Sequence, residues 1–302
     1  MKTCIVGAGA LGGLLGARMA LAGVEPTLLD RGVQLRALQD EGLRLLRSSG
    51  ETCETRAYRT AASCAEAGPH DLVLLCLKAY DLPDVADELP ALAHDDTVFV
   101  TLQNGIPWWY FQRHGGRLAD TRLRSVDPDG GLADRVDPRK IIGGVAYPAA
   151  EVEEPGVIRH VDGEVFALGE LDGETTDRLA AVCDVFETAG LRGRAIRDIR
   201  AELWLKELGS VSFNPLSALT GATMAGLCRR AETRSLARRM MEEALAVANG
   251  LGVSLRKTID QRIAGAETVG EHRTSMLQDL EAGRRLELDA LVGVVIEIGR
   301  LT

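Results

Sequence analysis

The sequence predicts an α/β protein in which an N-terminal Rossmann-type, doubly wound sheet is followed by an all-helical C-terminal domain. Three observations lead to this class. A strand runs directly into the glycine-spaced turn Gly7–Gly12, strands and helices then alternate, and from about Asp198 the apolar residues recur with helical spacing. The 302 residues are enough for two domains. We expect a dinucleotide-binding domain over residues 1–190 and a helical substrate-binding and catalytic domain over residues 191–302.

The first strand, Thr3–Val6, leads into the turn Gly7-Ala8-Gly9-Ala10-Leu11-Gly12. Gly7 permits the tight turn, Gly9 removes a side chain where the backbone approaches phosphate oxygens, and Gly12 lets the next helix pack on the strand. The unpaired amides and the positive dipole end of that helix favour a bound anion. The context on both sides indicates a dinucleotide site, whereas a GxGxxG turn alone can be purely structural.

The rest of the N-terminal domain is expected to alternate strands and helices. Further strands are predicted at Thr27–Leu29, Leu72–Leu77, Thr97–Leu102, Lys140–Val145, Val157–Val161 and Val165–Leu168, and helices at Leu14–Ala22 and Glu174–Ala189. Leu72–Leu77 and Thr97–Leu102 are nearly continuous apolar runs, which are typical of parallel strands buried on both faces.

The C-terminal third is helical in pattern. Met240, Ala244 and Ala248 fall on one face of a helix for which Gly250 is the expected C-cap. Val292–Leu301 is an apolar helix with no closing signal, so a continuation of the chain beyond Thr302 stays open.

Composition excludes several classes. The net charge of −9 disfavours nucleic acid or an anionic membrane as partner. No apolar run reaches the roughly 18–20 residues of a membrane span, and the start is a strand rather than a cleavable leader. The six cysteines and five histidines are scattered, which predicts reduced structural thiols, no metal site and a cytoplasmic location.

Lys206, Ser210 and Asn214 are spaced i, i+4 and i+8, so they form one polar stripe on an otherwise apolar helix. Pro215 is expected to end or bend this helix beside Asn214. Burial lowers the pKa of a lysine from about 10.4 towards neutrality and makes it a competent proton donor. A snorkelling lysine whose ammonium reaches solvent is the alternative, and spacing alone does not decide between them.

A second polar segment contains Ser275 and Glu287. Ser275 and Gln278 have the spacing of a capping box, which predicts Ser275 as an N-cap. Gly283 interrupts the helix, and Glu287 is expected in the first turn of the last helix, where an acid suits the positive helix end.

A third polar segment, Gln103-Asn104-Gly105, follows a predicted central strand, at the sheet edge where ligands bind in doubly wound folds. Lys78 follows another strand and is expected at the same edge. Asn104-Gly105 can equally be only a turn. The neighbouring pair Trp108–Trp109 is either core or the wall of an organic-substrate pocket.

Taken together, these segments resemble the ketopantoate reductase (2-dehydropantoate 2-reductase) family. The motifs that carry the resemblance are GAGALG at residues 7–12, LKAYD at 77–81, QNG at 103–105, EPGVI at 154–158, RAELWLK at 200–206, NPLSA at 214–218, and SMLQD at 275–279 followed by Glu287. They occur in order over nearly the whole chain. The resemblance implies a Rossmann domain, a helical C-terminal domain and NADPH-dependent reduction of a 2-oxo acid.

The resemblance also implies roles for individual residues. Lys206 matches the catalytic proton donor, and Glu287 matches an active-site glutamate that interacts with cofactor and ligands. Asn104 matches an asparagine that contacts both nicotinamide and substrate. Substrate-binding positions correspond to Ser210, Asn214 and Ser275, and cofactor-binding positions to the Gly7–Gly12 turn, Lys78 and Ala150. Ser210 stands where the family commonly has a second asparagine, and it is shorter than an amide side chain.

The cofactor preference depends on Asp30 and Arg31 at the end of the second strand. An arginine there suits the 2′-phosphate of NADP, whereas an acid prefers the free ribose hydroxyl of NAD. We expect NADPH, with NADH as the alternative.

The expected reaction is reduction of a small anionic 2-oxo acid, most simply ketopantoate to pantoate, as in pantothenate and coenzyme A biosynthesis. Ser210 and the Trp108–Trp109 pair motivate an alternative, a related dehydrogenase acting on another 2-oxo acid or a 3-hydroxy acid. A second alternative is a non-catalytic dinucleotide sensor. A homodimer is one option for the assembly.

Overall fold

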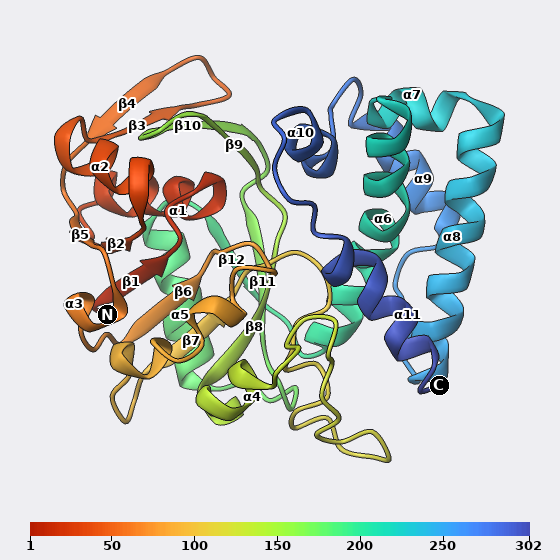
Figure 1. Cartoon of the computed structure of the whole chain (residues 1–302), viewed down its shortest axis with the longest axis horizontal. Helices are drawn as coiled ribbons and strands as arrows, with labels where there is room; N and C mark the ends of the chain where they lie inside the picture. The colour runs from red at the N-terminus through yellow and green to blue at the C-terminus, as the bar shows by residue number, and fades with distance from the viewer. The chain divides into compact units, whose positions relative to one another are not determined.

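The structure is a computed structural model that describes residues 1–302 in two compact units (Figure 1). Unit 1 comprises Met1–Gln103, Phe111–Arg122 and Gly130–Ile199, and unit 2 comprises Asn104–Tyr110, Leu123–Asp129 and Arg200–Thr302. The expected division at residue 190 differs from this one because a last parallel strand, residues 192–195, keeps the preceding chain in unit 1. Two short segments beyond residue 103 also belong with the C-terminal helices.

The main sheet of unit 1 has eight strands in the order β12-β11-β8-β7-β6-β1-β2-β5. Their bounds are β1 Thr3–Val6, β2 Thr27–Leu29, β5 Arg59–Ala61, β6 Leu72–Leu75, β7 Val98–Thr101, β8 Ile141–Ala146, β11 Val165–Glu170 and β12 Arg192–Ala195. All pairs are parallel except β8 with β11. Every residue of β1, β6 and β7 is buried, as continuous apolar strands between two covering layers require.

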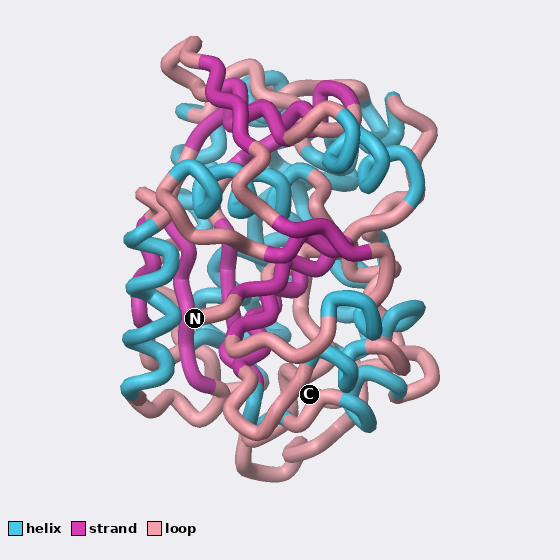
Figure 2. The backbone as a smooth tube through the Cα atoms, turned by 90° about the vertical axis from the view of Figure 1, so that its left-hand side faces the viewer, coloured by secondary structure: helices cyan, strands magenta, loops and turns pink.

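A second sheet of four strands, in the order β4-β3-β10-β9, was not predicted except for β10. Its strands are β3 Leu43–Leu46, β4 Thr52–Thr55, β9 Ala149–Glu154 and β10 Val157–Asp162. Strand β10 pairs in parallel with β3 and antiparallel with β9. Both sheets of unit 1 can be followed as magenta strands in Figure 2.

Helix α1, Ala10–Leu21, lies between the two sheets of unit 1 (Figure 1). Its glycines make this possible. A Cβ on Gly13 would lie 2.7 Å from the side chain of Ile158 in β10, and one on Gly16 would lie 2.7 Å from Leu28 in β2. Close approach on both faces therefore fixes the position of the helix.

The remaining helices of unit 1 are short or peripheral. They are α2 Gly32–Asp40, α3 Cys64–Ala67, α4 Gly131–Arg135 and α5 Asp177–Thr188, with 3₁₀ turns at Pro83–Val85, Leu89–Leu92 and Pro138–Lys140. The N-cap of helix α5 is Thr176, whose hydroxyl accepts a hydrogen bond from the Leu179 amide.

Unit 2 is helical, as predicted. It contains α6 Ile199–Thr220, α7 Met224–Arg229, α8 Ala231–Gly250, α9 Ile259–Thr268, α10 Ser275–Glu281, a π-helical turn at Asp289–Gly293 (η4) and α11 Val294–Gly299. None of these helices, nor any in unit 1, is long and apolar enough to cross a membrane.

Two predicted helix ends in unit 2 are corrected. Of the two effects expected of Pro215, ending or bending the helix, the first is wrong, because α6 continues to Thr220. Gly250 is the last residue of α8 rather than its cap, and Gly252 takes the left-handed conformation with φ +78°. The amides of Gly252 and Val253 bond to the carbonyls of Asn249 and Ala248, which is the Schellman pattern that satisfies the last turn.

Candidate functional site

The glycine turn of unit 1 has the geometry that its sequence predicted. Gly7 has φ +89°, and its amide donates to the carbonyl of Leu29 at 2.9 Å, which links the turn to β2. A Cβ on Gly12 would lie 1.9 Å from the Gly7 carbonyl oxygen, so only glycine fits there. Gly9 has no atom within 4 Å of the Cβ position, so the backbone is open on that side.

The N-terminus of α1 fits a dinucleotide pyrophosphate. The N-cap is Gly9, which offers no side-chain hydrogen bond, and the first turn contains no acidic residue. The amides of this 12-residue helix are therefore available to an external acceptor at the positive end of its dipole. The phosphate oxygens of the cofactor are acceptors of this kind.

Asp30 accepts a backbone hydrogen bond with each of its carboxylate oxygens, and one of these bonds comes from the glycine turn. Oδ2 accepts from the Ala8 amide at 2.6 Å, and Oδ1 accepts from the Arg31 amide at 2.7 Å. Burial raises the pKa of Asp30, and these hydrogen bonds oppose that rise. The Arg31 side chain is 56% exposed and pairs with Glu88 at 2.7 Å. The Asp30 carboxylate thus accepts hydrogen bonds from backbone amides, whereas the Arg31 guanidinium remains accessible to a ligand.

Two further predicted cofactor residues lie in unit 1. Lys78 is half-buried three residues after the end of β6 at Leu75, and its carbonyl accepts from the Asp81 amide at 3.0 Å. Ala150 is half-buried in β9, opposite His160 of β10. The second sheet therefore positions Ala150, which the sequence analysis identified only through the resemblance.

Three predicted residues meet in unit 2. Lys206 Nζ donates to Asn104 Oδ1 at 2.8 Å, and Asn104 Nδ2 donates to Glu287 Oε2 at 3.3 Å. Lys206 and Asn104 are half-buried, while Glu287 is only 5% exposed. The asparagine amide thus orients the ammonium and the carboxylate at its two ends.

Gly105 explains how Asn104 reaches this position. Its φ is +83°, and a Cβ would lie 2.0 Å from the carbonyl oxygen of Ala290. The Ile106 amide also donates to that carbonyl at 3.2 Å. The Asn104–Ile106 segment is thereby held against the π-helical turn that follows Glu287, a type of distortion that is frequent at functional sites.

The electrostatics of the Lys206 amine suit a proton donor. Loss of hydration lowers the pKa of Lys206 to about 8, and the charges of Glu207 and Glu287 oppose this while that of Arg262 adds to it. Glu207, 2% exposed, was not singled out from the sequence. Burial raises the pKa of Glu207 well above its usual range, and the positive charge of Lys206 opposes that rise.

The remaining substrate-side residues are partly accessible. Ser210 and Asn214 are half-buried on the Lys206 face of α6, and Ser210 Oγ donates weakly to the Lys206 carbonyl at 3.4 Å. Ser275 is exposed at the first residue of α10.

Two local predictions about α10 and the last helix are wrong. Thr274, not Ser275, is the N-cap, because its extended backbone lets Oγ1 accept from the Leu277 amide at 3.2 Å. Gln278 instead donates to the Arg273 carbonyl. Glu287 lies just before the last helix rather than in its first turn, because its carbonyl accepts from the Leu291 amide.

The tryptophan pair belongs to the core. Trp108 and Trp109 are 2% and 0% exposed. Next to them, Tyr110 packs edge-to-face on Trp204 with ring centroids 6.4 Å apart and accepts its indole hydrogen bond at 2.8 Å. These aromatic contacts anchor the segment that follows Asn104.

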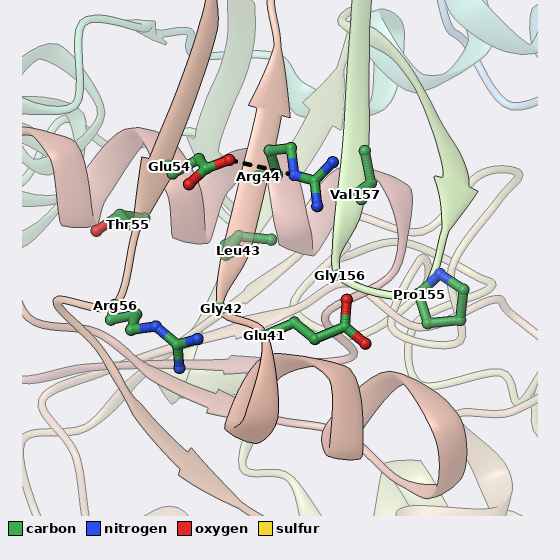
Figure 3. Close-up of a pocket in the computed structure, with 10 residues that line it drawn as sticks. All are labelled: Glu41, Gly42, Leu43, Arg44, Glu54, Thr55, Arg56, Pro155, Gly156 and Val157. Atoms are coloured by element: carbon green, nitrogen blue, oxygen red, sulfur yellow. Dashed lines mark ion pairs between the residues drawn. The ribbon is translucent and has the colours of Figure 1, made fainter.

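A separate hollow of about 360 Å³ lies at the second sheet of unit 1 (Figure 3). It is lined by Glu41, Gly42, Leu43, Arg44, Glu54, Thr55, Arg56, Pro155, Gly156 and Val157. Arg44 and Glu54 pair across it at 3.4 Å. None of the predicted site residues lines this hollow, so we do not place the chemistry there.

Family profiles match both parts of the chain. The profile described as ketopantoate reductase PanE/ApbA matches residues 3–173, and that of its C-terminal domain matches residues 198–302. The chain belongs to the ketopantoate reductase family. This confirms the resemblance inferred from the motifs, and the mixed α/β architecture confirms the predicted fold class.

Several ketopantoate reductases are similar over the full chain. A 2-dehydropantoate 2-reductase of Mesorhizobium japonicum is 49% identical over 100% of this chain and 92% of its own. One from Archaeoglobus fulgidus is 30% identical over 98% of this chain and 90% of its own. The solved 2-dehydropantoate 2-reductase of Geobacter metallireducens has a TM-score of 0.86 at 28% identity, covering 100% of this chain and 94% of its own.

A D-mandelate dehydrogenase solved with NADH and anilino(oxo)acetate shares the fold. Its TM-score is 0.84 at 23% identity, and the match covers 100% of this chain and 92% of that structure. The ketopantoate reductase fold is therefore also found in a dehydrogenase of a different name.

Proposed function

We propose that this protein reduces 2-dehydropantoate to pantoate with NADPH. The observation that carries the proposal is the hydrogen-bonded series Lys206–Asn104–Glu287, in which an amine with a lowered pKa is oriented by an amide. The names of the 49% and 30% identical relatives support the choice of substrate.

The mechanism follows from where charge develops. The reduced nicotinamide supplies the hydride to the ketone carbon when it is bound. Negative charge then grows on the ketone oxygen, where the Lys206 ammonium stabilises it and donates a proton. Asn104 fixes the ammonium through its Oδ1, and Glu287 holds the amide in that orientation. Asn214, Ser210 and Ser275 are the proposed contacts to the remaining polar groups of the substrate.

We propose that the cofactor is NADPH rather than NADH because of the contacts that Asp30 and Arg31 make. Both Asp30 oxygens accept backbone amides, which leaves them poorly placed for a ribose hydroxyl. The exposed Arg31 guanidinium suits a 2′-phosphate. Arg31→Ala should weaken NADPH binding by about tenfold, the scale of one charged hydrogen bond, and leave NADH binding unchanged. An equal loss for both cofactors would contradict this assignment.

The function is tested by following the absorbance of reduced nicotinamide with ketopantoate and a panel of other 2-oxo acids, using each cofactor in turn. The proposal requires ketopantoate with NADPH to have the highest kcat/KM. Preference for another acid would favour the related dehydrogenase, for which the short Ser210 is the supporting observation. Cofactor binding without turnover of any acid would favour a sensor.

We further propose that the protein works in the cytoplasm. Its six cysteines are unpaired, and Cys4, Cys64, Cys183 and Cys228 are buried, as expected in a reducing compartment. Recovery of the native protein in an oxidising compartment after cell fractionation would contradict this location.

A further inference from the structure

The peptide between Ala8 and Gly9 in the glycine turn is hydrogen-bonded by a side chain of helix α2. Gln34 Nε2 donates to the Ala8 carbonyl at 2.6 Å. Asp30 Oδ2 accepts from the amide of the same residue, also at 2.6 Å. Both peptide groups that flank the Cα of Ala8 are therefore bonded to side chains from outside the turn.

The direction of the Gly9 amide depends on the bond to Gln34. The chain has no cis peptide bond, so the Ala8 carbonyl and the Gly9 amide lie in one plane and point in opposite directions. Gly9 itself does not restrict that plane, because it has no side chain and no atom lies within 4 Å of its Cβ position. With the carbonyl bonded to Gln34, the amide points away from that side chain.

The second sheet fixes Gln34 at its other polar atom. Its Oε1 accepts from the Gly156 amide at 3.1 Å, in the turn between β9 and β10 (Figure 3). The Gly156 carbonyl accepts from the Arg44 amide of β3 at 2.8 Å. Gly156 has φ +78°, and a Cβ there would lie 3.0 Å from the Gly42 carbonyl oxygen, so the position requires glycine. The EPGVI motif at 154–158 thus holds the side chain that bonds the glycine turn.

We propose that Gln34 is a positioning residue that turns the Gly9 amide towards the pyrophosphate of the cofactor. This inference rests on the dinucleotide binding in the proposed function and deepens it. A primary amide suits the task, because it donates to a carbonyl and accepts from an amide at the same time. A flipped peptide would present the Ala8 carbonyl oxygen where a phosphate needs a donor. NADPH and NADH share the pyrophosphate, so the role is the same for either cofactor.

The first test removes both hydrogen bonds of Gln34 with a side chain of similar length. Gln34→Met should raise the Kd of NADPH and of NADH by the same factor, about 10- to 100-fold, the scale of one hydrogen bond to a charged group. Arg31→Ala, in contrast, should affect NADPH alone. The KM for ketopantoate and kcat at saturating NADPH should stay at wild-type values in Gln34→Met, because Lys206 and Asn104 belong to unit 2.

Gln39→Met is the matched control on the same helix. The Gln39 side chain is exposed and donates weakly to Thr60 Oγ1 at 3.4 Å. The substitution is identical and the helix propensities are similar. None of the constants above should change in this variant.

The second test observes the Gly9 amide by NMR in the protein without cofactor. In wild-type protein its resonance should be single and sharp. In Gln34→Met it should broaden or shift, because the unrestrained peptide exchanges between two orientations, and relaxation dispersion detects such exchange. Gln39→Met should leave the resonance unchanged.

The outcomes separate this proposal from the proposed function. Unchanged Kd values in Gln34→Met would overturn the role of Gln34 and leave the reductase function in place. Raised Kd values with an unchanged Gly9 resonance would also overturn it, because the peptide would not have moved. A lowered thermal midpoint with resonances that shift throughout unit 1 would make Gln34 merely structural.

Wild-type protein distinguishes the remaining cases. If it binds a dinucleotide but reduces no 2-oxo acid, the reductase function fails, and the Kd values and the Gly9 resonance still decide the role of Gln34. If it binds neither NADPH nor NADH, both proposals fail.

Discussion

The glycine turn of unit 1 and the Lys206 cluster of unit 2 are built on opposite principles. The turn presents backbone amides, and its limits are steric: a Cβ at Gly12 would lie 1.9 Å from a carbonyl oxygen. The cluster presents side chains, and electrostatics decides which substitutions it tolerates, because the pKa of Lys206 depends on burial and on three charged neighbours. The turn should therefore be sensitive to volume and indifferent to pH, while the cluster should show the reverse.

The largest effect should come from removing the amine. Lys206→Ala is expected to lower kcat by about 10²- to 10⁴-fold, the usual contribution of a general acid, while the Kd of NADPH stays within about twofold. Steady-state kinetics and fluorescence titration measure the two quantities. Near-normal turnover would remove the lysine from the mechanism.

A larger side chain in the glycine turn should instead weaken cofactor binding. Gly12→Val is expected to weaken NADPH binding by about 10- to 100-fold, since overpacking against a backbone oxygen costs roughly 1–3 kcal/mol. Gly265→Ala in helix α9 is the matched control, because no atom lies within 4 Å of its Cβ position and it lies outside the cofactor-binding turn. Equal losses in the two variants, measured by titration, would show that steric closeness to Gly7 is not what matters.

A change of pH should affect catalysis by the Lys206 cluster but not cofactor binding at the glycine turn. Lys206 donates only when protonated, so kcat for reduction should be constant below its pKa of about 8 and fall about tenfold per pH unit above it. Oxidation of pantoate needs the neutral amine and should rise over the same range. NADPH affinity should show no inflection near pH 8. A flat pH profile for reduction would contradict the lysine as donor.

The smallest effect is expected at Asp30. Asp30→Asn weakens the bonds to the Ala8 and Arg31 amides, but it also removes a charge whose burial is unfavourable, as the raised pKa shows. The two changes oppose each other, so the free energy of unfolding should change by no more than about 1 kcal/mol. Chemical denaturation measures it. A much larger loss would mean that the turn depends on charge after all.

The sequence predicted the elements whose stabilising contacts are local or strongly patterned. Strands Thr3–Val6 and Thr27–Leu29 were predicted to the residue, because the first is an apolar run that ends at Gly7 and the second lies between Pro26 and Asp30. The second sheet was missed because Thr52–Thr55 is polar and half exposed. Its pairing also joins Arg44 to Val157, a contact between distant segments that no local pattern reveals.

The site was predictable to a similar degree. Helical spacing singled out Lys206 without deciding whether it is functional. The resemblance then implied roles for Lys206, Asn104 and Glu287, and the structure brings these three residues together. Glu207 and Arg262 escaped, because a charged residue next to a lysine or on a short amphipathic helix ordinarily indicates a solvated surface. Their effect on the pKa of Lys206 depends on burial and on proximity, which only three-dimensional packing creates.

Helix α1 packs closely against a sheet on each of two sides, at Gly13 and at Gly16. The N-terminal end of the helix, which carries the free amides, is therefore ordered when the protein folds, before a cofactor binds. Because the conformational entropy of this segment is lost on folding, cofactor binding does not have to order it again. Substitutions that make the residues packed against α1 more flexible would weaken cofactor affinity, although none of these residues contacts the cofactor.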